Sequence, residues 1–205
     1  MNDFLFFLPK PHHPQSPKKG LHLRWRLGWI KGWCVRPIWS IRRWAGGSDI
    51  RVGKRFSLQG KVEARGPGRV MIGDDCIVSG LFTPYTHDRA AMITIGSRSF
   101  INGTRLGCAI RIEIGTDAIL ADARILDTDF HSVHRARNTL EHKNPLRLPI
   151  RIGNNVWIAA SAAILKGVQI GDDSVVAFGS VVTKSIPAGK IAAGNPAVVV
   201  SEVPS

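Results

Sequence analysis

His131 is the side chain of this sequence best placed for proton-transfer chemistry. A neutral histidine accepts a proton near pH 7, so histidine is the commonest general base in enzymes. His131 ends the segment 126–131, in which Leu126 is predicted to point inward, and the regular spacing of aliphatic residues then stops until Ile150. A histidine at the edge of a rigid element, beside an irregular excursion over residues 132–149, is predicted to face a ligand.

The residues around His131 leave several roles open. His134 is the rival base, although its position inside the excursion predicts that it is held less rigidly. Asp127 or Asp129 could bond the second ring nitrogen of the base and fix its tautomer. Both aspartates are equally suited to bond the backbone of a turn. The polar excursion itself is either a recognition loop or a plain spacer.

A six-residue repeat positions this histidine. Every sixth residue from Ile152 is a β-branched aliphatic: Ile152, Ile158, Ile164, Ile170, Val176 and Val182. Four residues after each of these lies a small or β-branched residue: Val156, Ala162, Val168, Ser174, Ser180 and Ile186. A helix of period 3.6 cannot hold these positions on one face, so the repeat predicts short strands.

The same period appears earlier in the chain, with breaks. An aliphatic residue followed by glycine recurs with its first member at positions 52, 72, 95, 114, 152 and 170. Such pairs indicate strands that repeatedly meet a tight corner, and the turn residues of β-hairpins are missing. A β-solenoid, in which each hexapeptide is one face of a coil and the repeated aliphatic points into a stacked core, satisfies the pattern.

The repeats and two further motifs resemble the hexapeptide-repeat acyltransferases. The motifs are Ile-Gly-Asn-Asn-Val-Trp-Ile at 152–158 and Ala-Ala-Gly-Asn-Pro-Ala at 192–197, and the similarity covers roughly residues 50–200. Within that family the sequence is most similar to galactoside, maltose and polysaccharide O-acetyltransferases. The resemblance implies an all-β solenoid, a left-handed parallel β-helix with three hexapeptides per coil, and a homotrimer with active sites between subunits.

The resemblance also implies roles for particular residues. It makes His131 the general base that takes the proton of an acceptor hydroxyl, and it puts Asn102 on the acceptor side. Asp129 and His134 are further candidates for contacts with the acceptor. Asn102 is equally suited to be a corner residue, because asparagine tolerates the left-handed conformation. Acetyl-CoA is the implied co-substrate, with no metal, and its implied contacts are Ala160, Gly179, Thr183 and Lys184. Because no Arg or Lys follows Pro196, its phosphates are expected to rely on Lys184, Lys166 or Lys190.

Charge is distributed unevenly along the chain. The 205 residues include 28 Lys and Arg against 15 Asp and Glu, a formal net charge of +13, of which residues 1–47 carry +8. Residues 1–47 therefore form a basic N-terminal arm, and residues 48–205 form the predicted acyltransferase domain. No RNA or DNA motif accompanies the charge, so nucleic acid is not expected as a partner. The three cysteines form no CxxC pair and are interpreted as buried or spare thiols in a reducing compartment.

The basic arm is predicted to be partly helical. Residues 9–20 are rich in proline and charge, typical of an extended linker. Trp25, Trp29 and Trp33 then follow at steps of four and would form one stripe on a helix. Tryptophan with arginine over residues 21–45 is typical of a helix lying on an anionic membrane. Alternatively the stripe caps the first coil, and both roles can hold together if the tryptophans face inward and the arginines face outward.

These patterns together predict an acetyl-CoA-dependent O-acetyltransferase that acts directly on a hydroxyl of a sugar or polysaccharide precursor. The expected location is the cytoplasm, with peripheral binding at the inner face of the cytoplasmic membrane. A longer acyl donor and a non-enzymatic trimeric assembly factor remain alternatives. A solenoid carbonic anhydrase would need three histidines around zinc, and the spacing of His131 and His134 does not follow the coil period.

Overall fold

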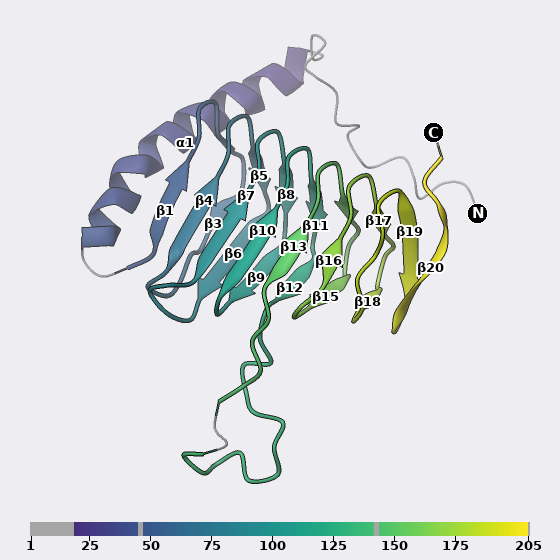
Figure 1. Ribbon diagram of the computed structural model, residues 1–205. Helices are drawn as coiled ribbons and strands as arrows, with labels where there is room; N and C mark the ends of the chain where they lie inside the picture. The colour runs from purple at the N-terminus through teal and green to yellow at the C-terminus, as the bar shows by residue number, and fades with distance from the viewer. Residues whose placement is uncertain (1–18, 45–46, 142–143, 205) are drawn as a thin grey trace.

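The computed structural model shows a parallel β-solenoid with one helix at its N-terminal end (Figure 1). It describes residues 19–44, 47–141 and 144–204. The strands stack into three sheets that form the faces of a prism, as the hexapeptide repeat predicts, and the left-handed winding is the one that the resemblance implies. The predicted fold class is therefore confirmed.

The strands of each coil enter the three sheets in turn, and all neighbours are parallel except β19 and β20. The first sheet holds β1 (Asp49–Val52), β4 (Arg69–Ile72), β7 (Met92–Ile95), β10 (Arg111–Ile114), β13 (Ile150–Ile152) and β16 (Gln169–Ile170). The second holds β2 (Ser57–Leu58), β5 (Ile77–Ser79), β8 (Phe100–Asn102), β11 (Ile119–Ala121), β14 (Trp157–Ile158), β17 (Val175–Val176), β19 (Lys190–Gly194) and β20 (Ala197–Glu202). The third holds β3 (Lys61–Val62), β6 (Leu81–Thr86), β9 (Arg105–Cys108), β12 (Arg124–Leu126), β15 (Ala163–Leu165) and β18 (Val181–Val182).

The core follows the predicted columns. The repeated aliphatic residues from Ile152 to Val182 are each at most 3% exposed, and the residues four positions after them are at most 5% exposed. Each coil thus places its apolar side chains directly above those of the coil before it, which removes them from water along the whole axis.

The predicted inward position of Leu126 is wrong by one residue. Ile125 is fully buried and pairs with Ile164, whereas Leu126 is half-buried and pairs with Leu165. The corner between β11 and β12 is shorter than the corner between β14 and β15 one coil later, so the register in the third sheet slips by one residue. Because strand side chains alternate in direction, the slip turns Leu126 outward and the next residue, Asp127, inward.

Helix α1 (Lys19–Trp44) covers the first coil of the solenoid (Figure 1). Its contact face has two glycines, and a Cβ at Gly32 would lie 2.5 Å from the carbonyl oxygen of Phe56. Trp39 follows on the same face, where it is 5% exposed and packs edge-on against Phe56 with ring centroids 6.2 Å apart. The glycines allow the helix to approach closely enough to close the end of the core.

Of the alternatives for the tryptophan stripe, the one in which it faces the solenoid is wrong for Trp29 and Trp33. Trp29 and Trp33 are 40% and 73% exposed, whereas Lys31 and Arg36 bond the backbone of the solenoid. Lys31 Nζ donates a hydrogen bond to Gly60 O at 2.7 Å, and an Arg36 guanidinium nitrogen donates to Gly53 O at 2.5 Å. The glycines, being small, occupy the contact face instead. The side chain of Trp25 and the linker up to residue 18 lie outside the described residues.

Candidate active site

Two edges of the prism carry the predicted site residues. The His131 edge is the column of connections from the third sheet to the first, and it contains residues 87–91, 127–149, 166–168 and 183–185. The Asn102 edge is the column of corners from the second sheet to the third, and it contains Asn102 and residues 159–162 and 177–180. The third sheet separates the two edges.

Asp127 fixes the start of the segment that leads to His131. Its carboxylate is fully buried and accepts hydrogen bonds from the backbone nitrogens of Ala109, Ile110 and Arg111 at 2.6, 2.8 and 2.8 Å. Three backbone donors satisfy the charge in place of water. Of the two alternatives for Asp127, the structure supports the one in which it bonds a corner backbone.

Thr128 and Asp129 hold the next part of the segment. Thr128 pairs with Arg147 on the returning limb of the excursion, and Asp129 N donates to Leu146 O at 3.2 Å. The Asp129 carboxylate accepts a bond from Lys166 Nζ, one coil onward, at 2.6 Å. Within the described residues neither Asp127 nor Asp129 bonds the His131 imidazole, because both carboxylates are turned to these other partners.

Phe130 packs against the preceding coil of the solenoid. Its backbone has a positive φ of 60°, a conformation that a bulky residue adopts only where its surroundings impose it. Its ring lies over Gly107 in the preceding coil, where a Cβ would approach Phe130 Cζ to 2.4 Å. The missing side chain at Gly107 is what makes room for the ring.

His131 itself is exposed at the end of this braced segment. Its backbone nitrogen donates to Asp129 O at 2.7 Å, and the described residues offer its imidazole no hydrogen bond. His134 is also exposed, but its Nδ1 accepts a hydrogen bond from the backbone nitrogen of Ala136 at 3.1 Å. His131 therefore combines a backbone held by a hydrogen bond with an exposed imidazole that is accessible to a substrate, which is the geometry expected of a general base.

The remaining predicted residues are divided between the two edges. Asp129, His134, Thr183 and Lys184 share the His131 edge, whereas Asn102, Ala160 and Gly179 lie on the other. Ala160 and Gly179 are neighbours in adjacent coils, since Gly179 N donates to Ala160 O at 3.0 Å. Within one chain, Asn102 and His131 do not come together.

The three lysines considered for phosphate binding differ in their partners. Lys166 pairs with Asp129, and Lys190 pairs with Glu202. Lys184 is exposed and has no ion pair within the described residues. Lys184 is therefore the one of the three whose ammonium group is available to an anionic ligand.

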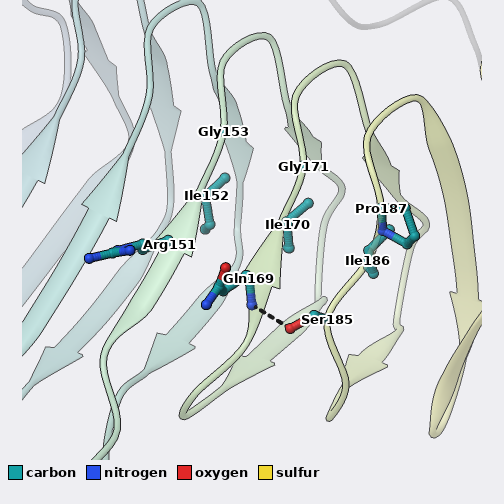
Figure 2. A pocket seen from close by; sticks show the side chains of 9 residues that line it. All are labelled: Arg151, Ile152, Gly153, Gln169, Ile170, Gly171, Ser185, Ile186 and Pro187. Atoms are coloured by element: carbon teal, nitrogen blue, oxygen red, sulfur yellow. Dashed lines mark hydrogen bonds between the residues drawn. The ribbon is translucent and has the colours of Figure 1, made fainter.

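A groove of about 410 Å³ lies beside β13 and β16 (Figure 2). Its lining includes Ile152, Ile170 and Ile186 from successive coils, and Gln169 N donates to Ser185 Oγ at 3.0 Å. None of the predicted site residues lines it. The groove belongs to the first sheet and not to the surface between the His131 and Asn102 edges.

Neither buried cysteine is arranged as a nucleophile. Burial raises the pKa of the Cys76 thiol to about 11. Burial, with the neighbouring Asp127 carboxylate, raises the pKa of the Cys108 thiol still further, and its Sγ lies 3.5 Å from Asp127 Oδ2. Thiols with raised pKa values stay protonated near neutral pH and are poor nucleophiles.

The described part of the chain contains neither a metal-binding cluster nor a membrane-spanning helix. It contains no group of three His, Cys, Asp or Glu side chains close enough to hold a metal ion, and His142 lies outside it. It also contains no helix that is both long enough and apolar enough to cross a bilayer.

Four residues near His131 were not predicted in the roles that the structure gives them, although Lys166 was considered for phosphate binding. Lys166 is the partner of Asp129, Gly107 makes room for the Phe130 ring, and the rings of His87 and Tyr85 contact that ring. Each lies between about 20 and 45 residues from its partner along the chain. Reading the sequence in steps of one coil would have brought His87 onto the same edge as His131, and Gly107 onto the adjacent strand β9.

Comparisons with known proteins agree with this architecture. Residues 149–184 match the bacterial transferase hexapeptide model of six repeats. The galactoside O-acetyltransferase of Escherichia coli K12 is 40% identical over 92 residues, which cover 45% of this chain and 44% of that protein. The chain therefore aligns with less than half the length of this curated relative.

Two solved structures have the same solenoid. A galactoside acetyltransferase in complex with coenzyme A is 28% identical, with a TM-score of 0.53 over 76% of this chain and 66% of that one. The polySia-specific acetyltransferase NeuO is 25% identical, with a TM-score of 0.56 over 77% of both chains. The predicted resemblance is thus confirmed: residues 149–184 carry the hexapeptide repeat of the bacterial transferases, on a solenoid similar to those of sugar acetyltransferases.

Proposed function

We propose that this protein is an acetyl-CoA-dependent O-acetyltransferase that modifies a sugar or polysaccharide hydroxyl. The observation that carries the proposal is the exposed His131 imidazole at the end of a segment braced by Asp127, Asp129 and Phe130. The similar galactoside acetyltransferase binds coenzyme A, and galactosides and polySia are the substrates named for the two similar structures, which supports the donor and the acceptor class.

The chemistry proceeds by direct transfer. His131 takes the proton of the acceptor hydroxyl while the hydroxyl oxygen attacks the thioester carbonyl carbon. The tetrahedral intermediate then collapses, the carbon–sulfur bond breaks, and the coenzyme A sulfur leaves with the proton that the imidazolium returns. Exposed Lys184 supplies a positive charge for the donor phosphates. No acyl-enzyme is needed, in keeping with the raised thiol pKa values.

Labelled acetyl-CoA tests this assignment. The full chain is incubated with galactosides, maltose and oligosialic acid, and transfer of label to a sugar is followed together with release of the free thiol. Longer acyl-CoA donors are run in parallel, and preferential use of one of them would replace acetyl as the transferred group. If calorimetry detects no binding of any acyl-CoA, the non-enzymatic assembly factor becomes the better hypothesis.

We further propose that the complete site forms between two copies in a homotrimer. Asn102 and His131 lie on opposite edges of the third sheet, so one chain presents half of the predicted site on each edge. In a closed three-fold ring, the His131 edge of one copy faces the Asn102 edge of the next. The same contact would bring Ala160 and Gly179 of one copy to Lys184 of its neighbour.

Complementation between two inactive variants should reveal the shared site. Each of the variants Asn102→Ala and His131→Ala is expected to be nearly inactive alone. When the two are co-expressed, random mixing places both native residues in about one quarter of the sites, so about one quarter of the wild-type activity should return. Activity of purified mixed oligomers is the measurement. If the mixed oligomers are as inactive as either variant alone, Asn102 and His131 act in the site of a single chain, and the shared-site proposal is wrong.

We propose that α1 holds the protein on an anionic membrane, at the inner face of the cytoplasmic membrane. The helix side that faces away from the solenoid carries Leu27, Ile30, Trp33 and Ile38, which are 54%, 59%, 73% and 54% exposed. A capping helix at a solenoid end ordinarily has a polar outer side for solubility. This outer side is apolar, which favours an additional contact that covers it.

The positive charge of α1 favours a lipid surface as the partner that covers its apolar outer side. Helix α1 contains seven Lys and Arg residues and no acidic residue. Arg24 and Arg26 precede its exposed apolar stretch along the helix, and Arg42 and Arg43 follow it. An apolar stripe with tryptophan, flanked by basic residues, is the composition of a helix lying in the headgroup region of anionic lipid.

The double substitution Ile30→Glu with Trp33→Glu should weaken vesicle binding at least about tenfold, because two apolar anchors become acidic. Flotation with phosphatidylcholine vesicles, with and without phosphatidylserine, is the measurement. Val200→Glu is the matched control, since Val200 is an exposed apolar residue, at 57%, on β20, which lies at the other end of the second sheet from the strand β2 that α1 contacts. Binding that is insensitive to phosphatidylserine, or a double variant that changes only the oligomeric state, would contradict the membrane assignment.

A further inference from the structure

A cluster of three rings lies on the His131 edge beside the proposed base. The Tyr85 and His87 ring centroids are 5.1 Å apart and nearly perpendicular. The His87 and Phe130 centroids are 5.0 Å apart, and those of Tyr85 and Phe130 are 6.3 Å apart. Because Phe130 directly precedes His131 in the chain, the cluster borders the position of the proposed acceptor hydroxyl.

We propose that Tyr85, His87 and Phe130 form a stacking platform for a sugar ring of the acceptor. This inference rests on the proposed function and adds the surface that orients the substrate. His87 is exposed, and Tyr85 and Phe130 are half-buried, so their rings remain open to a ligand. One face of a pyranose carries mainly C–H groups, which pack on aromatic faces and lose little hydration.

The platform is rigid before any ligand arrives. His87 N donates to Cys108 O in the next coil at 2.8 Å. The following residue, Asp88, accepts hydrogen bonds from the backbone nitrogens of Ala90 and Ala91 at 2.9 and 3.1 Å. A surface that is fixed in advance loses less conformational entropy on binding, so its contacts contribute more to affinity.

The excursion closes one side of the same region. Arg147 on its returning limb lies 3.7 Å from the Asp88 carboxylate, which ties residues 144–149 to the loop that carries His87. Thr128, two residues before Phe130, pairs with Arg147 as well. The platform, the excursion and His131 are therefore parts of one connected surface, as recognition of a ring next to its reacting hydroxyl requires.

Kinetics with the galactoside and oligosialic acid acceptors test the platform. His87→Ala and Tyr85→Ala should each raise the acceptor KM by about three- to tenfold, with the acetyl-CoA KM unchanged. His87→Phe keeps a ring and should retain most of the acceptor affinity. Arg89→Ala is the matched control, because Arg89 is an exposed neighbour in the same loop outside the ring cluster.

The outcomes separate the platform from the function on which it rests. An unchanged acceptor KM in His87→Ala, in a protein whose transfer activity still requires His131, would overturn the platform alone. If His87→Phe loses kcat as completely as His131→Ala, His87 acts in proton transfer, and the stacking role is wrong. If no transfer occurs to any of these sugars, the proposed function fails and the platform fails with it.

Discussion

Replacing His131 by alanine is expected to lower kcat for acetyl transfer by about 10²- to 10⁴-fold, the usual contribution of a general base. Acetyl-CoA binding should stay close to that of the wild type, because the imidazole acts on the acceptor hydroxyl and not on the donor phosphates. Steady-state kinetics and calorimetry with acetyl-CoA measure the two effects separately.

Val133→Ala is the matched control for this substitution. Val133 lies two residues beyond His131, is 84% exposed, and takes no part in the contacts that hold the segment. Its replacement should leave kcat unchanged. A His131→Ala variant that turned over at the wild-type rate would remove His131 from the chemistry and return His134 to consideration.

Asp127→Ala should cause the largest loss of stability among substitutions on the His131 edge. The carboxylate is fully buried, and its removal leaves the backbone nitrogens of Ala109, Ile110 and Arg111 without their acceptor. Buried donors that lose a charged partner cost about 3–5 kcal/mol of the free energy of unfolding. Urea denaturation followed by circular dichroism measures this loss as a lower midpoint.

Two further variants keep this prediction testable if Asp127→Ala does not fold. Asp127→Asn retains one side-chain oxygen as acceptor, so its loss should be intermediate. Asp129→Asn weakens only the half-buried pair with Lys166 and should cost no more than about 1 kcal/mol. Equal midpoints for the Asp127 and Asp129 variants would show that the buried carboxylate is not the main support of the corner.

The position of His131 was predictable because a break in a regular repeat is visible in a sequence. The period ends before the excursion, and the structure places His131 at that point, exposed and on an edge. The outward direction of Leu126 was not predictable from the period alone. It depends on the length of the corner between β11 and β12, and one residue fewer there reverses which side chains face the core.

The neighbours of His131 were not predictable, because they come from other coils. Lys166 reaches Asp129 from the following coil, and Gly107 and His87 reach Phe130 from preceding ones. These contacts depend on how many residues each connection contains, and the connections vary from corner to corner. Likewise, helical spacing correctly indicated a helix, but only packing decided that Gly28 and Gly32, and not Trp29 and Trp33, would face the solenoid.

The sequence by itself determined the architecture, because burying an aliphatic residue at every sixth position is possible only if short strands wind into a stacked coil. It also determined that a histidine would stand where the winding is interrupted. The tertiary structure alone decided which residues share an edge: it put Asn102 and His131 on opposite sides of the third sheet, and it brought the rings of Tyr85 and His87 to Phe130, the residue before His131. The reason is that neighbours in a solenoid lie a coil apart in sequence, and the length of each coil is set by its corners.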